Sequence, residues 1–298
     1  MTEPVGLLVL DKPAGITSHD VVARARRALG LRRVGHAGTL DPPATGVLLV
    51  GVGRATRLLR FLQGADKAYE GTLVLGATTT TLDATGETTG TFEMSGVTEE
   101  EVAAAAAALT GDLDQVPPMV SAVHVDGRRL HELAREGIEV ERAPRRVHVK
   151  RFDVAALGEG RYRFEVVCGS GTYVRSLVDD LGRTLGGGAH LAVLRRTRVG
   201  AFRIDEAAGL EELEERGAAL LRTPAQMVAD LASLRVGAGA VADVLHGRAI
   251  SAPGTVSAGP VAVLGPDGAL VAVCAPHRDG TLRPEVVVAT HGAADADD

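Results

Sequence analysis

The chain has 298 residues, 45% of them hydrophobic, which suits one large domain plus a small one with a sizeable core. No run of about 18 apolar residues occurs, so no membrane-spanning helix is expected. Residues 1–4 lack the basic stretch and apolar core that mark a signal peptide, which favours a cytoplasmic protein. The net charge of -6 by itself argues against a nucleic-acid-binding protein.

The charge is unevenly distributed along the chain. Residues 1–67 carry a net charge of +5 and residues 128–200 carry +6, whereas residues 68–127 carry -10 and residues 201–298 carry -7. If the two basic blocks fold together, they form a positive face that attracts a polyanion such as RNA. The alternative is ordinary solvated arginine, and charge alone leaves both interpretations open.

Short strands and helices mix through the first 200 residues. Strands are predicted at 6–10, 47–50, 69–75, 162–168 and 190–199. Helices are predicted at 18–29 (with Ser18 as N-cap and Gly30 at the C-terminal end), 55–62, 98–110 (opened by a Thr98–Glu101 capping box), 128–136 and 173–185. Residues 35–46 are predicted to form a loop. Because no regular βαβ period occurs, an α+β fold is expected.

The character of the sequence changes near residue 203. An acidic helix at 211–221 leads into short apolar strands separated by Gly/Pro turns, which predicts a small β-rich module. We therefore expect a large domain over residues 1–225, a small one over 230–291, and a disordered acidic tail over 292–298. The two cysteines, Cys168 and Cys274, fit neither a disulfide framework nor a zinc site and are expected to be small buried hydrophobes.

The most unusual segment is the loop of residues 35–46, which has Asp41 near its centre. Three glycines permit tight turns, and Pro42 and Pro43 restrict the backbone immediately after Asp41. A carboxylate on such a stiff loop is pre-set in position, as a nucleophile must be. The alternative is that Asp-Pro only begins a common turn, and the loop taken alone favours that alternative.

Two further positions have side chains suited to work beside a carboxylate. Arg175 lies near the start of a predicted helix, where its fork of donors can hold a carboxylate ionised and oriented. Tyr69 is one of three tyrosines in a chain without tryptophan, so a base-stacking platform must come from few positions. The alternatives are a surface ion pair for Arg175 and an ordinary core strand residue for Tyr69.

No cofactor or metal is implied by the sequence. His36 has no second ligand at metal-site spacing, so a zinc site is not expected. The sequence also lacks a phosphate-binding Walker loop and a dinucleotide fingerprint. A Ser/His/Asp triad has no supporting G-x-S-x-G motif.

Taken together and in order, the motifs resemble the bacterial tRNA pseudouridine-55 synthases. The resemblance covers about residues 5–200. It rests on Leu10-Asp11-Lys12-Pro13 with Gly15 and Ser18, on Gly35 to Pro42, on Lys67-Ala68-Tyr69, on Gly171 to Arg175 with Asp179 to Gly182, and on Gly188-Ala189-His190 leading to Leu194-Arg195-Arg196.

The resemblance implies a catalytic core with a central, mostly antiparallel sheet flanked by helices, followed by a C-terminal PUA-like RNA-binding module. It also implies isomerisation of uridine 55 in the T-loop of tRNA, on a base flipped out of its stack. The expected partner is the T-arm of tRNA. We expect no cofactor, no membrane, no obligate protein partner, and a monomer.

The resemblance also assigns roles to individual residues. It makes Asp41 the nucleophile, Arg175 its ionic partner, and Tyr69 the residue that stacks on the target base and helps to move its C5 proton. Whether Asp41 attacks C1′ of the sugar or C6 of the base is left open.

The remaining assignments concern substrate contacts and support of the loop. Tyr173 and Leu194 are expected to line the base pocket, and His36 to contact RNA. Lys12 and Pro42 are expected to support the loop structurally.

Several positions depart from the family pattern. Residues 78–81 are four threonines before Asp83, where the family usually has an arginine and an aspartate. His124 and His131 stand where Lys and Tyr are common, and Ala37 where Thr is common. These changes fall in the region that is expected to bind RNA. Two other functions stay open: a non-catalytic RNA-binding or RNA-folding protein, and a pseudouridine synthase for another RNA site.

Overall fold

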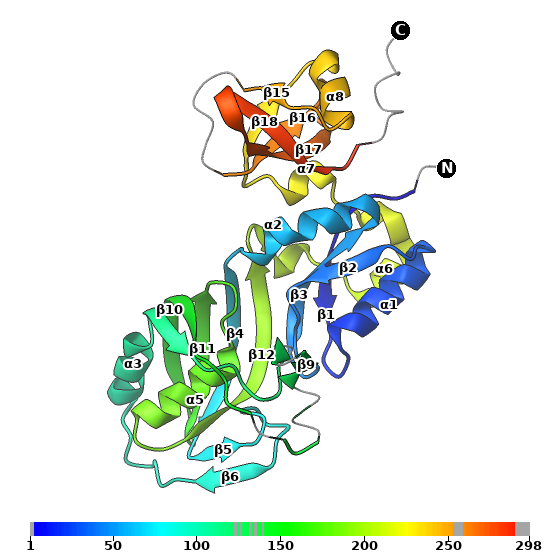
Figure 1. Cartoon of the computed structure of the whole chain (residues 1–298). Coiled ribbons are helices and arrows are strands. Elements are labelled where there is room, and N and C mark those ends of the chain that lie inside the picture. Colours follow the sequence, from blue (N-terminus) through cyan, green and yellow to red (C-terminus); the bar gives the residue numbers. More distant parts are fainter. Residues whose placement is uncertain are drawn as a thin grey trace.

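A nine-stranded sheet runs through the larger part of the molecule (Figure 1). The computed structural model describes residues 3–121, 124–125, 127–130, 133, 136–138, 140–252 and 259–289. The main path of the sheet is β1-β3-β12-β4-β11-β10-β7, with β2 beside β3 and β13 beside β12. Its strands are β1 (Gly6–Lys12), β2 (Val34–Ala37), β3 (Thr45–Val52), β4 (Lys67–Leu75), β7 (Gly111–Gln115), β10 (Arg145–Gly158), β11 (Arg161–Cys168), β12 (Ala189–Val199) and β13 (Phe202–Arg203).

The pairings within this sheet are antiparallel in the described part of the chain, except that β12 runs parallel to β3. Helices flank the sheet and separate hairpins lie outside it. The prediction of an α+β fold with a central, mostly antiparallel sheet is therefore confirmed. The helices are α1 (Ser18–Leu29), α2 (Leu59–Gln63), α3 (Glu99–Ala108), α5 (Val174–Thr184), α6 (Leu210–Arg216), α7 (Pro224–Met227) and α8 (Ala238–Leu245).

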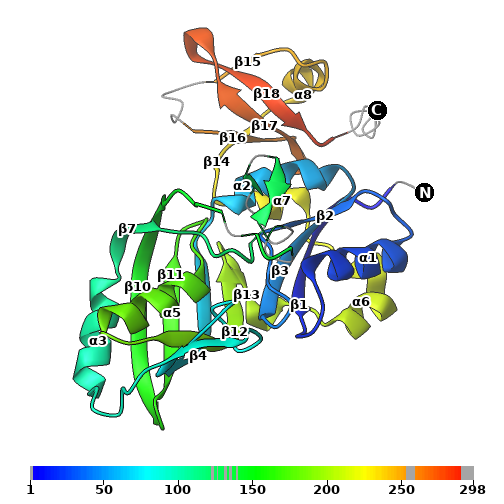
Figure 2. The same cartoon turned by 60° about the horizontal axis from the view of Figure 1, so that its bottom comes forward.

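The two halves of the sheet are covered differently. In β1 and β3 nearly every residue is buried, because α1 and α6 cover one face and α2 with α7 covers the other. This explains their continuous apolar runs. In β4 and β11 burial alternates, since α3 and α5 cover one face only (Figures 1 and 2). Tyr69, Phe164 and Leu194 point into that covered face.

The start of α1 corrects one prediction. Thr17, not Ser18, is the N-cap: its hydroxyl accepts a hydrogen bond from the backbone N–H of Asp20, and the Asp20 carboxylate accepts from that of Thr17. This capping box leaves the Ser18 hydroxyl free for a different bond, described below. The C-terminal prediction is confirmed, with Gly30 as a left-handed cap at φ 64°.

Other element boundaries also shift. The first residues of the predicted 35–46 loop belong to β2, and the predicted 55–62 helix is a 3₁₀ turn (Gly53–Leu58) followed by α2. The Thr98–Glu101 capping box of α3 is confirmed. The acidic helix ends at Arg216 and continues as a 3₁₀ turn (Gly217–Leu220).

Within the predicted 128–136 helix, Arg128–Arg129 form strand β9, which pairs with β8 (His124–Val125). Four positions of that predicted helix lie outside the described residues: 131, 132, 134 and 135. His131 and the predicted tail over 292–298 are thus outside them as well. A further hairpin joins β5 (Ala77–Thr79) to β6 (Thr88–Thr91).

The C-terminal residues form a separate five-stranded sheet in the order β14-β16-β17-β18-β15, with α8 packed against it. The strands are β14 (Ala232–Arg235), β15 (Ile250–Ser251), β16 (Val261–Leu264), β17 (Leu270–Pro276) and β18 (Thr281–Val287). The expected β-rich module is thus present. Both cysteines are free and buried, as predicted. No described helix is long and apolar enough to cross a membrane.

The C-terminal module contacts the larger part through apolar side chains and three arginines. Val273 and Val286 share a hydrophobic cluster with Leu58. Arg54 and Arg57 donate hydrogen bonds to the carbonyls of residues 289 and 287, at 3.3 and 3.2 Å, and Arg60 pairs with the Glu285 carboxylate at 2.6 Å. Arg54 and Arg57 lie on the 3₁₀ turn (Gly53–Leu58) and Arg60 lies on α2, so one short segment supplies these polar contacts to the module.

Candidate active site

The loop of residues 38–44, called here the Asp41 loop, joins β2 to β3 and is fixed on its C-terminal side by a buried lysine. Lys12 is fully buried, and its Nζ donates to the carbonyls of Pro13 (2.9 Å), Ile16 (2.7 Å) and Pro42 (3.1 Å). The Pro42 carbonyl also accepts from the N–H of Gly15 at 2.8 Å. Burial lowers the pKa of Lys12 to about 8, and Asp41 opposes that shift.

The residue before Asp41 is fixed by the hydroxyl of Ser18. Ser18 is 1% exposed, and its Oγ accepts from the Leu40 N–H (2.9 Å) and donates to the Leu40 carbonyl (3.2 Å). One side chain of α1 therefore satisfies both backbone polar groups of Leu40. This fixes the direction in which the chain presents Asp41.

The N-terminal side of the loop is fixed by Arg196 of β12, which is 1% exposed. Its guanidinium donates to the carbonyls of Val47 (2.7 Å), Gly38 (3.0 Å) and Thr39 (3.5 Å). The chain passes very close here: a Cβ on Gly46 would lie 2.2 Å from the Arg196 carbonyl, and Gly46 has φ 105°. Only glycine fits that position.

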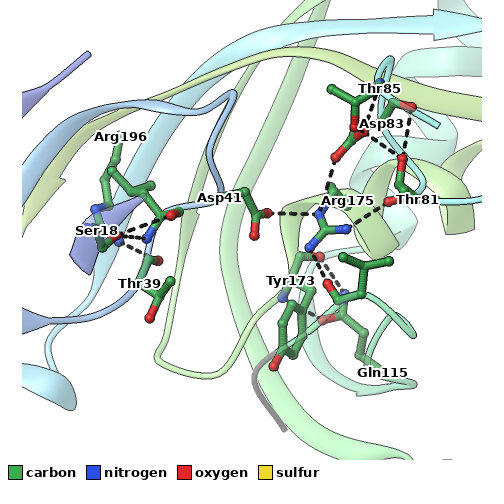
Figure 3. Close-up of polar contacts among 12 residues, drawn as sticks. Ser18, Thr39, Asp41, Thr81, Asp83, Thr85, Gln115, Tyr173, Arg175 and Arg196 are labelled. Atoms are coloured by element: carbon green, nitrogen blue, oxygen red, sulfur yellow. Dashed lines mark hydrogen bonds and ion pairs between the residues drawn. The ribbon is translucent and has the colours of Figure 1, made fainter. Parts of the chain in front are cut away.

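The Asp41 carboxylate points from this loop toward Arg175 (Figure 3). Arg175 Nε lies 2.9 Å from Asp41 Oδ2; the arginine side chain is 4% exposed and the aspartate 38%. The other two donors of the guanidinium bind the carbonyls of Thr81 and Val120, both at 2.8 Å. The arginine is thus immobilised by backbone groups, while the carboxylate keeps an open side that a substrate can reach.

A second carboxylate lies near the same nitrogen of Arg175. Asp83 Oδ2 is 3.9 Å from Arg175 Nε, and Asp83 Oδ1 accepts from the Thr81 hydroxyl (2.7 Å), the Thr85 hydroxyl (2.5 Å) and the Thr85 N–H (3.0 Å). Two carboxylates therefore share one guanidinium, and the group has a net charge of -1 when both are ionised. Figure 3 shows Asp41 and Asp83 approaching that nitrogen from different directions.

A pocket opens beside Asp41 and Arg175. Its lining combines these charged groups with small and apolar side chains: Asp41, Pro43, Ala44, Asp83, Ala84, Thr85, Arg175, Leu191, Ala192 and Leu194. The predicted Leu194 is among them. Tyr69 is not a lining residue; it is 8% exposed and shares a hydrophobic cluster with Leu40, Ala44 and Leu194. Burial raises the pKa of the Tyr69 hydroxyl.

The two remaining predicted contact residues, Tyr173 and His36, are not among the lining residues of this pocket. Tyr173 is the N-cap residue of α5, and Gln115 bonds both its N–H (2.7 Å) and its carbonyl (3.1 Å). His36 lies on β2, with its ring edge-on to His19 at a centroid distance of 5.3 Å. Burial, together with the charges of His19 and Arg196, lowers the pKa of His36, so the ring is neutral at pH 7.

Comparisons with known proteins decide the family. Residues 26–174 match the model of the TruB family pseudouridylate synthase N-terminal domain, residues 175–229 that of the tRNA pseudouridylate synthase B C-terminal domain, and residues 231–289 that of the tRNA pseudouridine synthase II C-terminal domain. The chain belongs to the TruB family. It is 48% identical to the tRNA pseudouridine synthase B of Mycobacterium sp. (strain KMS), covering 95% of each chain.

Further TruB relatives and solved structures agree with this family. The tRNA pseudouridine synthase B of Thermobifida fusca (strain YX) is 48% identical, covering 95% of this chain and 98% of that one. A solved structure described as an H/ACA RNP bound to a substrate RNA containing 2'-deoxyuridine has a TM-score of 0.73 and 26% identity, covering 96% of this chain and 85% of that chain. A Cbf5-Nop10-Gar1 complex gives a TM-score of 0.72 and 29% identity, covering 92% and 79%.

Several residues of this TruB site escaped the sequence reasoning. Asp83 was read only as part of a departure from the family pattern, yet it contacts Arg175. Gln115 fixes the Tyr173 backbone from 58 residues away, and Arg196 bonds Gly38 from a separation of 158 residues. Ser18 and Arg196 both belong to the motifs that carry the family resemblance, but Ser18 is predicted only as a helix cap and Arg196 is given no role in the site.

Proposed function

We propose that the protein is a tRNA pseudouridine synthase that isomerises uridine 55 in the T-loop. The observation that carries the proposal is the Asp41 carboxylate, tethered on both sides, paired with a buried arginine at 2.9 Å and open to a pocket. Its curated relatives that carry the name tRNA pseudouridine synthase B support tRNA as the substrate. The reaction needs no net oxidation and no external group, which suits a site built from one nucleophile and a small pocket.

In this proposal Asp41 is the nucleophile that allows the glycosidic bond from N1 to C1′ to break. After its addition at C1′ or at C6 and cleavage of that bond, the uracil turns and forms the bond from C5 to C1′. The bond to Asp41 then breaks, C5 loses its proton and N1 gains one, so the enzyme is regenerated without a net change in oxidation state. Arg175 keeps the carboxylate aimed, because each of its three nitrogens has a fixed acceptor. Asp83, 3.9 Å from the same Nε, adds a second negative charge beside the guanidinium.

The base must leave the RNA stack to reach Asp41. Leu194 lines the pocket, and Tyr173 stands at the N-terminus of α5 next to Arg175 (Figure 3). Tyr69, beside Leu194 in the hydrophobic cluster, supplies the stacking surface and the hydroxyl that helps to move the C5 proton. His36, which is partly buried on β2, is proposed to contact RNA.

Lys12 and Pro42 serve as supports in this proposal, because the lysine bonds the carbonyl that directly follows Asp41. We further propose that residues 1–225 form the catalytic domain and that residues 230–291 form a PUA-like module that contacts RNA. The expected partner is the T-arm of tRNA, bound by a monomer in the cytoplasm.

The decisive experiment is a position-resolved map of pseudouridine in an unmodified tRNA transcript after incubation with the purified protein and no cofactor. A matched transcript with cytidine at position 55 is the control. Pseudouridine at position 55 alone supports the proposal. Modification elsewhere points to a synthase for another RNA site, and binding without modification points to a non-catalytic RNA-binding protein; either result overturns it.

A further inference from the structure

Arg196 is a buried cation. Burying its charge lowers the stability of the fold, which suggests that the side chain has a function. It is 1% exposed, and no carboxylate of the described chain lies within ion-pair distance of it. Its charge lowers the pKa of two lysines, Lys12 and Lys67, and that of the His36 ring, so positive charge already surrounds it. Burying a charge among like charges is unfavourable, so the bonds to the three backbone carbonyls must offset a cost that a neutral side chain would not have.

Arg196 lies on β12, between the neighbouring strands β3 and β4. Arg196 is directly opposite Tyr69 in the antiparallel pairing of β12 with β4, and opposite Gly46 in the parallel pairing of β12 with β3. Directly opposed residues have their Cβ atoms about 5 Å apart, on the same face of the sheet. From this position the side chain reaches the carbonyls of Gly38 and Thr39, at the start of the Asp41 loop.

The same side chain also affects the Tyr69 hydroxyl. Burial raises the pKa of that hydroxyl, while the positive charge of Arg196, on the directly opposed residue of β12, lowers it. Arg196 therefore favours negative charge on the phenol oxygen.

We propose that Arg196 is a positioning residue: its guanidinium bonds the start of the Asp41 loop, and its place on β12 sets it directly beside Tyr69, which keeps the base platform and the nucleophile in register. Its planar fork fixes the direction of the bonds to the Val47, Thr39 and Gly38 carbonyls, which the flexible ammonium of a lysine does not do. The inference rests on the proposed function, because it assigns a purpose to the alignment of Tyr69 with Asp41.

The kinetic test compares Arg196→Lys with Arg198→Lys, a control on the same strand whose side chain bonds the Gly200 carbonyl. We expect the single-turnover rate of Arg196→Lys to fall roughly 100-fold, the cost of about an ångström of misplacement, with tRNA affinity within about threefold of the unaltered protein. The control stays within about threefold. A rate for Arg196→Lys within threefold of the unaltered protein overturns the positioning role.

A spectroscopic test separates positioning from general structural support. The chain has three tyrosines, so labelling with 13C at the ring Cζ gives three resonances, each assigned by a Tyr→Phe variant. We expect Arg196→Lys to move the Tyr69 resonance and to leave that of Tyr162 unchanged. Loss of rate with an unmoved Tyr69 resonance contradicts the link to the phenol.

The unaltered protein provides a measurement that needs no folded variant. We expect slowly exchanging guanidinium protons of Arg196 with nuclear Overhauser contacts to the Tyr69 ring. Absence of these contacts refutes the inference even if the protein modifies tRNA. If the contacts are present but no pseudouridine forms in any transcript, the proposed function fails and the structural link stands.

Discussion

The Asp41 loop and the C-terminal module are both joined to the central sheet by cationic side chains, but in different surroundings. At the loop, Lys12 and Arg196 are buried and bond backbone carbonyls. At the module, Arg60 and its partner Glu285 are 51% and 43% exposed. Buried bonds define a geometry, because breaking them leaves polar groups without partners, whereas exposed bonds can exchange with water at little cost.

This difference matches what each region requires. The loop needs a single geometry, so every residue from Gly38 to Pro42 has a backbone or side-chain bond to another element. The module contact combines an apolar cluster with solvent-accessible arginines, which is enough to place a binding module beside the catalytic sheet.

Among the residues that support Asp41, the largest effect is expected at Arg175. Arg175→Lys keeps the positive charge but loses the fork that bonds Asp41, Thr81 and Val120 together. We expect the single-turnover rate to fall by about 10²–10³-fold. Arg183→Lys is the control, since Arg183 lies on the same helix and its side chain is 70% exposed. A loss of less than about tenfold at Arg175 contradicts the role of the fork.

A change at Lys12 tests the bonds that fix the C-terminal side of the Asp41 loop. Lys12→Met removes the donor that the carbonyls of Pro13, Ile16 and Pro42 share, so that Pro42 keeps only the bond from the Gly15 N–H, and we expect the free energy of unfolding at pH 7 to drop by about 3 kcal/mol in denaturant titrations. A drop in the free energy of unfolding below about 1 kcal/mol would show that water replaces the lysine and that its bonds to the loop contribute little.

The stability of the unaltered protein and that of the Lys12→Met variant should depend on pH differently. The pKa of Lys12 is lowered from 10.5 to about 8 in the folded protein, so between these values the unfolded chain binds a proton that the folded chain does not. Stability of the unaltered protein relative to Lys12→Met therefore rises with pH over that window, by roughly 2–3 kcal/mol in total. Parallel pH curves for the two proteins would contradict the lowered pKa.

Ser18 gives a smaller effect. Ser18→Ala removes both bonds to the Leu40 backbone while α1 keeps its Thr17 capping box. We expect a loss of about 1–2 kcal/mol in stability and about tenfold in turnover, because the residue next to Asp41 gains freedom. Thr184→Ala, which removes an exposed bond within α5, serves as the control.

The smallest effect is expected at the module contact. Arg60→Ala removes an exposed ion pair with Glu285, and we expect a change in unfolding free energy within about 0.5 kcal/mol. Turnover should match that of the unaltered protein. A loss above about 1 kcal/mol in calorimetry would show that the exposed arginines contribute as much as the buried ones, and the contrast between the two regions would disappear.

The sequence predicted those parts of the molecule that depend on neighbouring residues. Strands such as Gly6–Lys12 and helix α3 follow from apolar patterning and a capping box, and the ordered motifs indicated the family. The supports of the site were missed because their partners are distant: Arg196 acts on Gly38, and Ser18 acts on Leu40 instead of on its own helix. Spacing along the chain contains no information on such contacts.

The central claim is that the Asp41 carboxylate performs the chemistry, and Asp41→Asn tests it most directly, because the amide keeps the size and removes the charge. Single-turnover mapping of pseudouridine at position 55 should show at least about a 10³-fold loss of rate, with tRNA affinity within a few-fold of the unaltered protein. Turnover retained within about tenfold by Asp41→Asn, with the fold intact, would contradict the account.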